Sequence, residues 1–113
     1  MNIEKFLKDS LNIEKEALAT VEAIESLVLR KKDEADTLIE EYAQDLTYLE
    51  NAALTVVKMV QALPEEDMRQ VFAARYLHKM TWGEAADAIY LSAMHVQRLH
   101  KKGLKWLEEN YRV

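Results

Sequence analysis

The sequence predicts an all-α protein, and three observations carry that prediction. Only 2 Gly and 1 Pro occur among 113 residues, so few positions favour the turns that many short strands would need. Half of the residues are hydrophobic and 31% are charged, a balance typical of a folded chain. Apolar residues also recur at steps of three and four over long stretches, which is the spacing of one helix face.

Pro64 marks the predicted boundary between two domains, residues 1–63 and residues 64–113. A proline disfavours helix in the residue before it, so we expect one helix to end near Leu63. Pro64 itself suits the first turn of the next helix, which would continue to about Lys79. The inward side of that helix would carry Met68, Val71, Phe72, Tyr76 and Leu77.

Residues 1–63 carry a heptad pattern, the signature of a helix face that needs a partner helix. Upstream, Leu7, Leu11, Leu18, Val21 and Val28 hold the same register. Two arrangements fit the pattern: a hairpin that turns near Arg30–Asp33, or one continuous coiled-coil helix. In either case this segment could join two copies of the chain, so we expect a homo-oligomer. From Ala35 the pattern is formed by residues 35, 39, 42, 46, 49, 53, 56, 60 and 63.

Two further helices are predicted by their capping residues. Thr81 and Glu84 have the spacing of a capping box, which begins a short helix from Trp82 to about Ile89. Ser92 is a second N-cap and begins a helix that runs to about Asn110. Two capped helices joined by about three residues have the outline of a helix-turn-helix motif.

The helix after Ser92 would bury one face and expose a basic one. On a helical wheel Val96, Leu99, Gly103 and Leu107 share the apolar side, and His100 points towards it. A helix in the DNA major groove places its early residues at base edges and its later basic residues at phosphates. The candidates for base contacts are Met94, Gln97 and Arg98, with Ala93 beside them, and the candidates for phosphate contacts are His95, Lys101, Lys102 and Lys105.

Residues 63–107 resemble the region 4 helix-turn-helix of sigma factors, and more closely the phage-encoded transcriptional regulators of the ArpU/RinA kind. The matching residues are Leu63-Pro64, Arg75-Tyr76-Leu77, Thr81-Trp82, Glu84-Ala85-Ala86, Ser92, Val96-Gln97-Arg98-Leu99-His100 and Leu104. The resemblance implies a regulator of phage genes that binds double-stranded DNA in the cytoplasm of a bacterial host, with possible contact to RNA polymerase. It implies base contacts from Ala93, Met94, Gln97 and Arg98, and no catalytic residues.

The chain departs from those relatives at the turn. Tyr90 stands where they commonly have Gly, so a positive φ there would carry strain. Ala93 and Met94 also replace polar residues that would normally contact bases. Gly83 and Gly103 lie inside predicted helices, where each costs about 1 kcal/mol relative to Ala.

Other classes of function find little support in the sequence. Three histidines occur and no cysteines, and His95 and His100 do not share a helix face, so we expect no metal and no cofactor. No phosphate-binding glycine loop and no nucleophile paired with a base occur, so we expect no enzyme. No apolar run approaches the ~18 residues of a membrane span.

Two functions remain open. The first is a transcription regulator that reads DNA with the helix after Ser92. The second is a non-catalytic interaction or assembly protein that binds a protein partner through its acidic N-terminal helices. The two domains differ in charge: residues 1–63 hold 13 acidic and 7 basic side chains, and residues 64–113 hold 7 and 8. The net charge of −5 therefore does not argue against DNA binding by the second domain.

Overall fold

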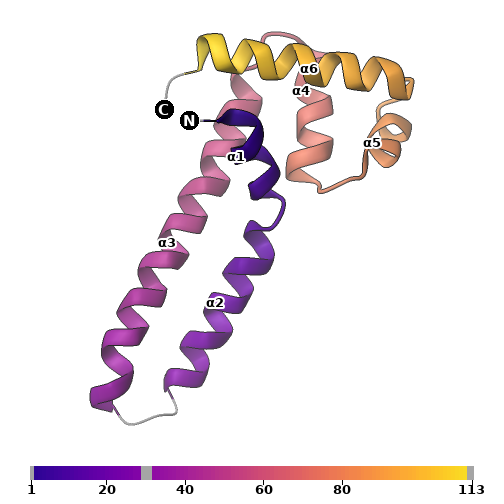
Figure 1. Cartoon of the computed structure of the whole chain (residues 1–113). Helices are drawn as coiled ribbons and strands as arrows, with labels where there is room; N and C mark the ends of the chain where they lie inside the picture. The colour runs from indigo at the N-terminus through magenta and orange to yellow at the C-terminus, as the bar shows by residue number, and fades with distance from the viewer. Residues whose placement is uncertain (1, 29–31, 112–113) are drawn as a thin grey trace. The chain divides into compact units, whose positions relative to one another are not determined.

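The structure is a computed structural model that describes residues 2–28 and 32–111, with the side chains of residues 2–25 and 39–111. The described residues form six α-helices and one π-helical turn, with no strand (Figure 1). The predicted all-α fold is therefore confirmed. The elements are α1 (Ile3–Ser10), α2 (Ile13–Val28), α3 (Lys32–Ala62), α4 (Glu66–Phe72), η1 (Ala73–Leu77), α5 (Trp82–Ala88) and α6 (Ala93–Asn110).

The helices group into two compact units. Residues up to Leu11 and residues from Thr55 onward form the first, here called the composite unit, and residues 12–54 form the second, the inserted unit. The composite unit thus combines segments from both ends of the sequence. This division differs from the expected boundary between residues 63 and 64, because side chains of α1 and of the end of α3 pack with the later helices.

The first helix joins the composite unit through two buried side chains and one long-range hydrogen bond. Asn2 caps α1 by accepting a hydrogen bond from the backbone N–H of Lys5 at 3.0 Å. Ile3 and Leu7 are buried in the core, and α1 contacts both η1 and α6. The Lys79 Nζ donates to the backbone carbonyl of Ser10 at 2.9 Å, which fixes the last residue of α1.

The core of the composite unit draws on every helix in it. Phe72 and Tyr76 supply its largest aromatic side chains, and both are almost fully buried. Half-buried residues, among them Trp82, Leu91 and Trp106, pack around its edge. The buried cluster consists of Ile3, Leu7, Val56, Met59, Val60, Leu63, Met68, Val71, Phe72, Tyr76, Ala86, Val96, Leu99, Leu104 and Leu107.

The region around Pro64 confirms part of the prediction and corrects the rest. Helix α3 ends at Ala62, as the proline requires, and the Arg69 Nη1 donates to the Leu63 carbonyl at 2.7 Å. Pro64 lies before the next helix rather than in its first turn, because Glu65 is the N-cap of α4. The predicted helix to Lys79 is also divided, since α4 ends at Phe72 and continues as the π-helical turn η1.

The inserted unit contains α2 and the first part of α3. Figure 1 shows these two segments running in opposite directions, as in the hairpin rather than the continuous helix. The predicted turn near Arg30–Asp33 falls partly on residues 29–31, which lie outside the described residues. Along α3, Ile39, Tyr42 and Leu46 are half-buried, as the heptad pattern predicts.

On the N-terminal side the same pattern is wrong at one position. Leu7 is buried and Leu11 and Val21 are half-buried, as predicted, whereas Leu18 is 59% exposed. The side chain of Val28 lies outside the described residues, and a turn at residues 11–12 interrupts the helix. Leu7 and Leu18, which the pattern placed on one stripe, therefore lie in different units and different environments. None of the described helices is both long and apolar enough to cross a membrane.

Candidate nucleic-acid interface

Helix α5 begins at a capping box that the sequence predicts correctly. The Thr81 hydroxyl accepts from the Glu84 backbone N–H at 3.2 Å, and the Glu84 carboxylate accepts from the Thr81 backbone N–H at 3.0 Å. These hydrogen bonds satisfy amide groups that have no partner within the helix. They also lower the pKa of Glu84, chiefly through its bond to the Thr81 backbone. The start of α5 is therefore fixed within four residues.

The turn between α5 and α6 is a Schellman motif centred on Tyr90. The Leu91 N–H donates to the Ala86 carbonyl at 3.1 Å, and the Tyr90 N–H donates to the Asp87 carbonyl at 3.4 Å. This arrangement requires a left-handed residue after the helix, and Tyr90 has φ 58°. Tyr90 therefore adopts the positive φ that would carry strain at a residue other than glycine.

Helix α6 starts at Ser92, as predicted. The Ser92 hydroxyl accepts from the His95 backbone N–H at 3.1 Å. Leu91, just before the cap, packs against the core cluster that contains Val96, and this pair has the spacing of a hydrophobic staple. Cap and staple together set the direction in which α6 leaves the turn.

The buried face of α6 packs closely against α4. Val96, Leu99 and Leu107 are buried, as the wheel predicts. At Gly103 the two helices approach so closely that an added Cβ would overlap the Phe72 ring and lie 3.2 Å from the Met68 Cγ. Glycine in mid-helix is therefore a packing requirement at this position.

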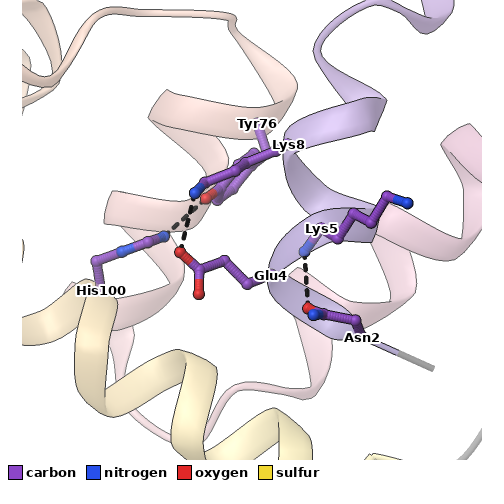
Figure 2. Close-up of polar contacts among 6 residues, drawn as sticks. All are labelled: Asn2, Glu4, Lys5, Lys8, Tyr76 and His100. Atoms are coloured by element: carbon purple, nitrogen blue, oxygen red, sulfur yellow. Dashed lines mark hydrogen bonds and ion pairs between the residues drawn. The ribbon is translucent and has the colours of Figure 1, made fainter.

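A second fixed point of α6 is a buried polar pair. The Tyr76 hydroxyl and the His100 Nε2 are hydrogen-bonded at 2.7 Å, and Figure 2 shows the two side chains pointing towards each other from different helices. His100 also stacks on Phe72 with ring centroids 5.1 Å apart, and its ring lies edge-on to Trp82 at 4.5 Å. The sequence predicts that His100 points towards the buried side of the helix, but nothing in its spacing identifies Tyr76 as the partner.

Burial shifts the pKa of both partners in the direction that disfavours their charged forms. It lowers the pKa of His100 to about 4, with Glu4 opposing that shift and Arg75 and Lys8 adding to it. Burial likewise raises the pKa of Tyr76 to about 12. Glu4 and Lys8 form an ion pair at 3.1 Å on α1, beside the Tyr76–His100 pair (Figure 2). At neutral pH both buried partners are therefore uncharged.

The opposite face of α6 is exposed and basic. Met94 is 73% exposed, and Ala93, Gln97 and Arg98 near it are exposed as well. Further along, Lys101, Lys102 and Lys105 are exposed, and His95 is half-exposed. Within the described part of the chain, the one ion pair is on α1, so the four exposed cations of α6 are not neutralised there. The helix thus gathers all of the predicted contact residues near or on its free side.

Among the described side chains, those of residues 2–25 and 39–111, there is no group of three or more His, Cys, Asp or Glu that could hold a metal ion. From Ala93 to Lys105 the exposed α6 residues are neutral or cationic, and the acidic Glu108 and Glu109 follow near the end of the helix. Such a surface suits a polyanion better than a small molecule, which needs a concave pocket.

The fold and the exposed basic face of α6 together identify a helix-turn-helix within the composite unit. Helix α5 is its first helix and α6 is its second. Residues 60–109 match the family described as Sigma-70, region 4. This part of the chain therefore resembles the DNA-binding helix-turn-helix of sigma region 4. No curated protein and no solved structure matches the chain. The matched range does not include α1, which nevertheless packs in the same unit.

Proposed function

We propose that this protein is a transcription regulator that inserts α6 into the DNA major groove. The observation that carries the proposal is the exposed basic face of α6, which lies opposite its buried face in a sigma region 4-like domain. A recognition helix needs this division, because one face must hold the helix in the domain while the other meets DNA.

The order of exposed residues along α6 suits that role. Arg98 can donate two hydrogen bonds to guanine, Gln97 can pair with adenine, and Met94 or Ala93 can contact a thymine methyl. Lys101, Lys102 and Lys105 follow towards the carboxyl end, where they would meet phosphate oxygens, and His95 would meet a phosphate beside the first turn. Base contacts would thus come from the first turns and backbone contacts from the later ones.

The distribution of charge supports the same assignment. The inserted unit, residues 12–54, holds 11 acidic and 4 basic side chains, a balance of −7. The rest of the chain holds 9 acidic and 11 basic side chains, a balance of +2. Positive charge is therefore concentrated in the unit that carries α6, where it would favour approach to DNA.

The biological setting follows from the resemblance of residues 63–107 to phage regulators. We infer a regulator encoded by a phage or prophage, acting in the bacterial cytoplasm, with RNA polymerase as a possible further partner. The half-buried stripe of Ile39, Tyr42 and Leu46 supports a role of the inserted unit in joining two copies. Sedimentation equilibrium tests that inference, since a mass of one chain at all concentrations contradicts it.

Fluorescence anisotropy with a labelled duplex from the DNA around the gene tests the proposal. The titration is repeated from about 50 to 200 mM salt, because each phosphate contact releases about one counterion. The double variant Arg98→Ala/Lys101→Ala should bind about 10- to 100-fold more weakly, with a shallower salt dependence.

The matched control is Lys15→Ala/Lys58→Ala, which removes the same charge from exposed positions outside α6. Its affinity should stay close to that of the unchanged protein. If both double variants bind equally well, α6 is not the DNA-binding surface. The alternative function, protein binding through the acidic inserted unit, would then be the one to pursue.

A further inference from the structure

Tyr90 is the most exposed of the large hydrophobic residues that the structure describes. Its residue is 94% exposed, although its backbone holds the centre of the turn between α5 and α6. The residues on either side behave differently, since Ile89 and Leu91 both pack against the core. The fold therefore uses the backbone of Tyr90 and leaves its side chain free.

The backbone conformation makes this choice of residue costly. Tyr90 has φ 58°, a left-handed conformation that is unfavourable for a residue with a Cβ but readily adopted by glycine. The C′ position of a Schellman motif is accordingly most often glycine. Glycine at position 90 would therefore give a more stable turn than tyrosine does.

A second left-handed residue shows how such a cost can be repaid within the fold. Lys79 also has φ 58° and follows η1 in a similar turn, where the Met80 N–H donates to the Ala74 carbonyl at 3.0 Å. Its side chain, however, donates to the Ser10 carbonyl at 2.9 Å and so ties α1 to the unit. Tyr90 has no comparable contact among the described residues, so its side chain calls for a role outside the fold.

The position of Tyr90 indicates that role. It lies two residues before the N-cap Ser92 and four before Met94, which is 73% exposed at the start of α6. This is the end of α6 that adjoins α5 in Figure 1. In a helix-turn-helix the second helix enters the groove while the first helix crosses the sugar-phosphate backbone, so the turn that holds Tyr90 joins a groove contact to a backbone contact. Tyrosine hydroxyls are among the groups that bind phosphate oxygens in such complexes.

We propose that Tyr90 is a DNA-backbone contact, with its hydroxyl donating a hydrogen bond to a phosphate oxygen beside the groove that α6 enters. This inference rests on the proposed function and adds a residue outside the recognition helix to the interface. A neutral donor to phosphate has a distinctive signature. It adds affinity without base preference, and it displaces no counterion of its own.

Two substitutions test the proposal in opposite directions. Tyr90→Gly relieves the left-handed strain, so its thermal unfolding temperature should rise, yet its affinity for the labelled duplex should fall about tenfold. Tyr90→Phe keeps the ring and removes only the hydroxyl. Its affinity for the labelled duplex should therefore fall about threefold, and its thermal unfolding temperature should not rise. Because the fold improves while binding weakens in Tyr90→Gly, unfolding cannot explain the loss.

The salt titration separates this contact from the lysine contacts. Tyr90→Gly should keep the slope of log affinity against log salt, whereas Lys101→Ala should reduce it by about 1. The loss should also be the same on the genomic duplex and on one of scrambled sequence. Tyr48→Phe is the matched control, because Tyr48 is an exposed tyrosine of the inserted unit, and it should bind as the unchanged protein does.

The outcomes of these measurements distinguish failure of the Tyr90 contact from failure of the proposed function. If Arg98→Ala/Lys101→Ala weakens binding but Tyr90→Gly and Tyr90→Phe do not, the Tyr90 contact is refuted and the proposed function stands. A loss confined to the genomic duplex would also overturn it, since a phosphate contact has no base preference. If the unchanged protein binds neither duplex, the proposed function fails and the Tyr90 contact fails with it.

Discussion

At the scale of single residues, His100 combines a role in packing with a proton equilibrium. It contacts Phe72 and Trp82 and shares a hydrogen bond with Tyr76, so it connects α6 to the rest of the core. The burial that accompanies these contacts also lowers the pKa of His100 to about 4. Folding therefore favours the neutral imidazole, while the unfolded chain takes up the proton near the ordinary value of 6.5.

This difference predicts a dependence of stability on pH. Because the folded pKa lies below the unfolded one, His100 contributes its full stabilisation above about pH 6.5, and that stabilisation is lost as pH falls towards 4. The loss should be on the order of 2–3 kcal/mol in the free energy of unfolding. Urea titrations at several pH values measure it, with His100→Gln as the reference that cannot titrate. A parallel pH dependence in both proteins would contradict the prediction.

Several residue-level features were predictable because their causes lie within a few residues. Thr81, Glu84 and Ser92 form the predicted caps, since a cap depends only on the next three backbone amides. The left-handed conformation of Tyr90 was only a condition raised by the resemblance, because the relatives commonly have Gly at that position. The partner of His100 was not, because Tyr76 lies 24 residues away and only tertiary packing brings the two together.

The described structure places the predicted DNA-contact residues without testing their roles. Met94, Gln97 and Arg98 are exposed because Val96 and Leu99 occupy the core side of the same helix. That alternation is visible in the sequence, so the face could be predicted. Which base each residue contacts depends on a partner outside the chain, so those assignments stay predictions.

At the scale of elements, the approach of α4 to α6 depends on one glycine. A Cβ at Gly103 would overlap Phe72, whereas a Cβ at Gly83 would meet no atom within 4 Å. The sequence gives both residues the same cost in a helix. Only the structure shows that Gly103 permits a close helix contact, and that Gly83 has no such role.

Alanine at the two glycines should therefore have opposite effects. Gly103→Ala should lower the free energy of unfolding by about 1–3 kcal/mol, as for an overpacked core position. Gly83→Ala should leave it unchanged or raise it by up to about 1 kcal/mol through helix propensity. Thermal or urea unfolding of the two variants provides the comparison. Equal effects would mean that α4 can shift away from α6 at little cost.

The elements also show where sequence patterns fail. The long apolar repeat predicts one register for residues 7–28, but the turn at residues 11–12 divides α1 from α2. Leu77 is similarly exposed rather than buried, because in η1 the hydrogen-bonded residues are five apart in sequence rather than four, as in the bond from the His78 N–H to the Ala73 carbonyl. Both departures change the rotation of a helix, which a fixed repeat cannot anticipate.

At the scale of the whole molecule, the region 4-like domain is larger than the range that matches the family. Residues 60–109 match, but Leu7 is fully buried in the same core as Val96 and Leu107. The apolar repeat gave no reason to separate Leu7 from Leu18, because the two differ only in the contacts that folding brings to them. Long-range packing of this kind cannot be read from a local pattern.

Alanine substitutions at these two leucines should separate their roles. Leu7→Ala should lower the free energy of unfolding of the composite unit by about 2–5 kcal/mol, the usual cost of truncating a buried leucine. Leu18→Ala should change it by less than about 0.5 kcal/mol, because Leu18 is largely exposed. Tryptophan fluorescence during urea unfolding follows the composite unit, since Trp82 and Trp106 both belong to it. Similar losses in the two variants would place α1 outside the core.

The composite unit also imposes an order of events on synthesis. Helix α1 emerges from the ribosome about 90 residues before the part of α6 that it contacts, a delay of roughly 5–20 s at ordinary rates of translation. During that interval Ile3 and Leu7 have none of the α6 side chains that cover them in the finished fold. During synthesis the nascent chain therefore carries the apolar face of α1 without its α6 contacts for that interval, at the stage when chaperones encounter it.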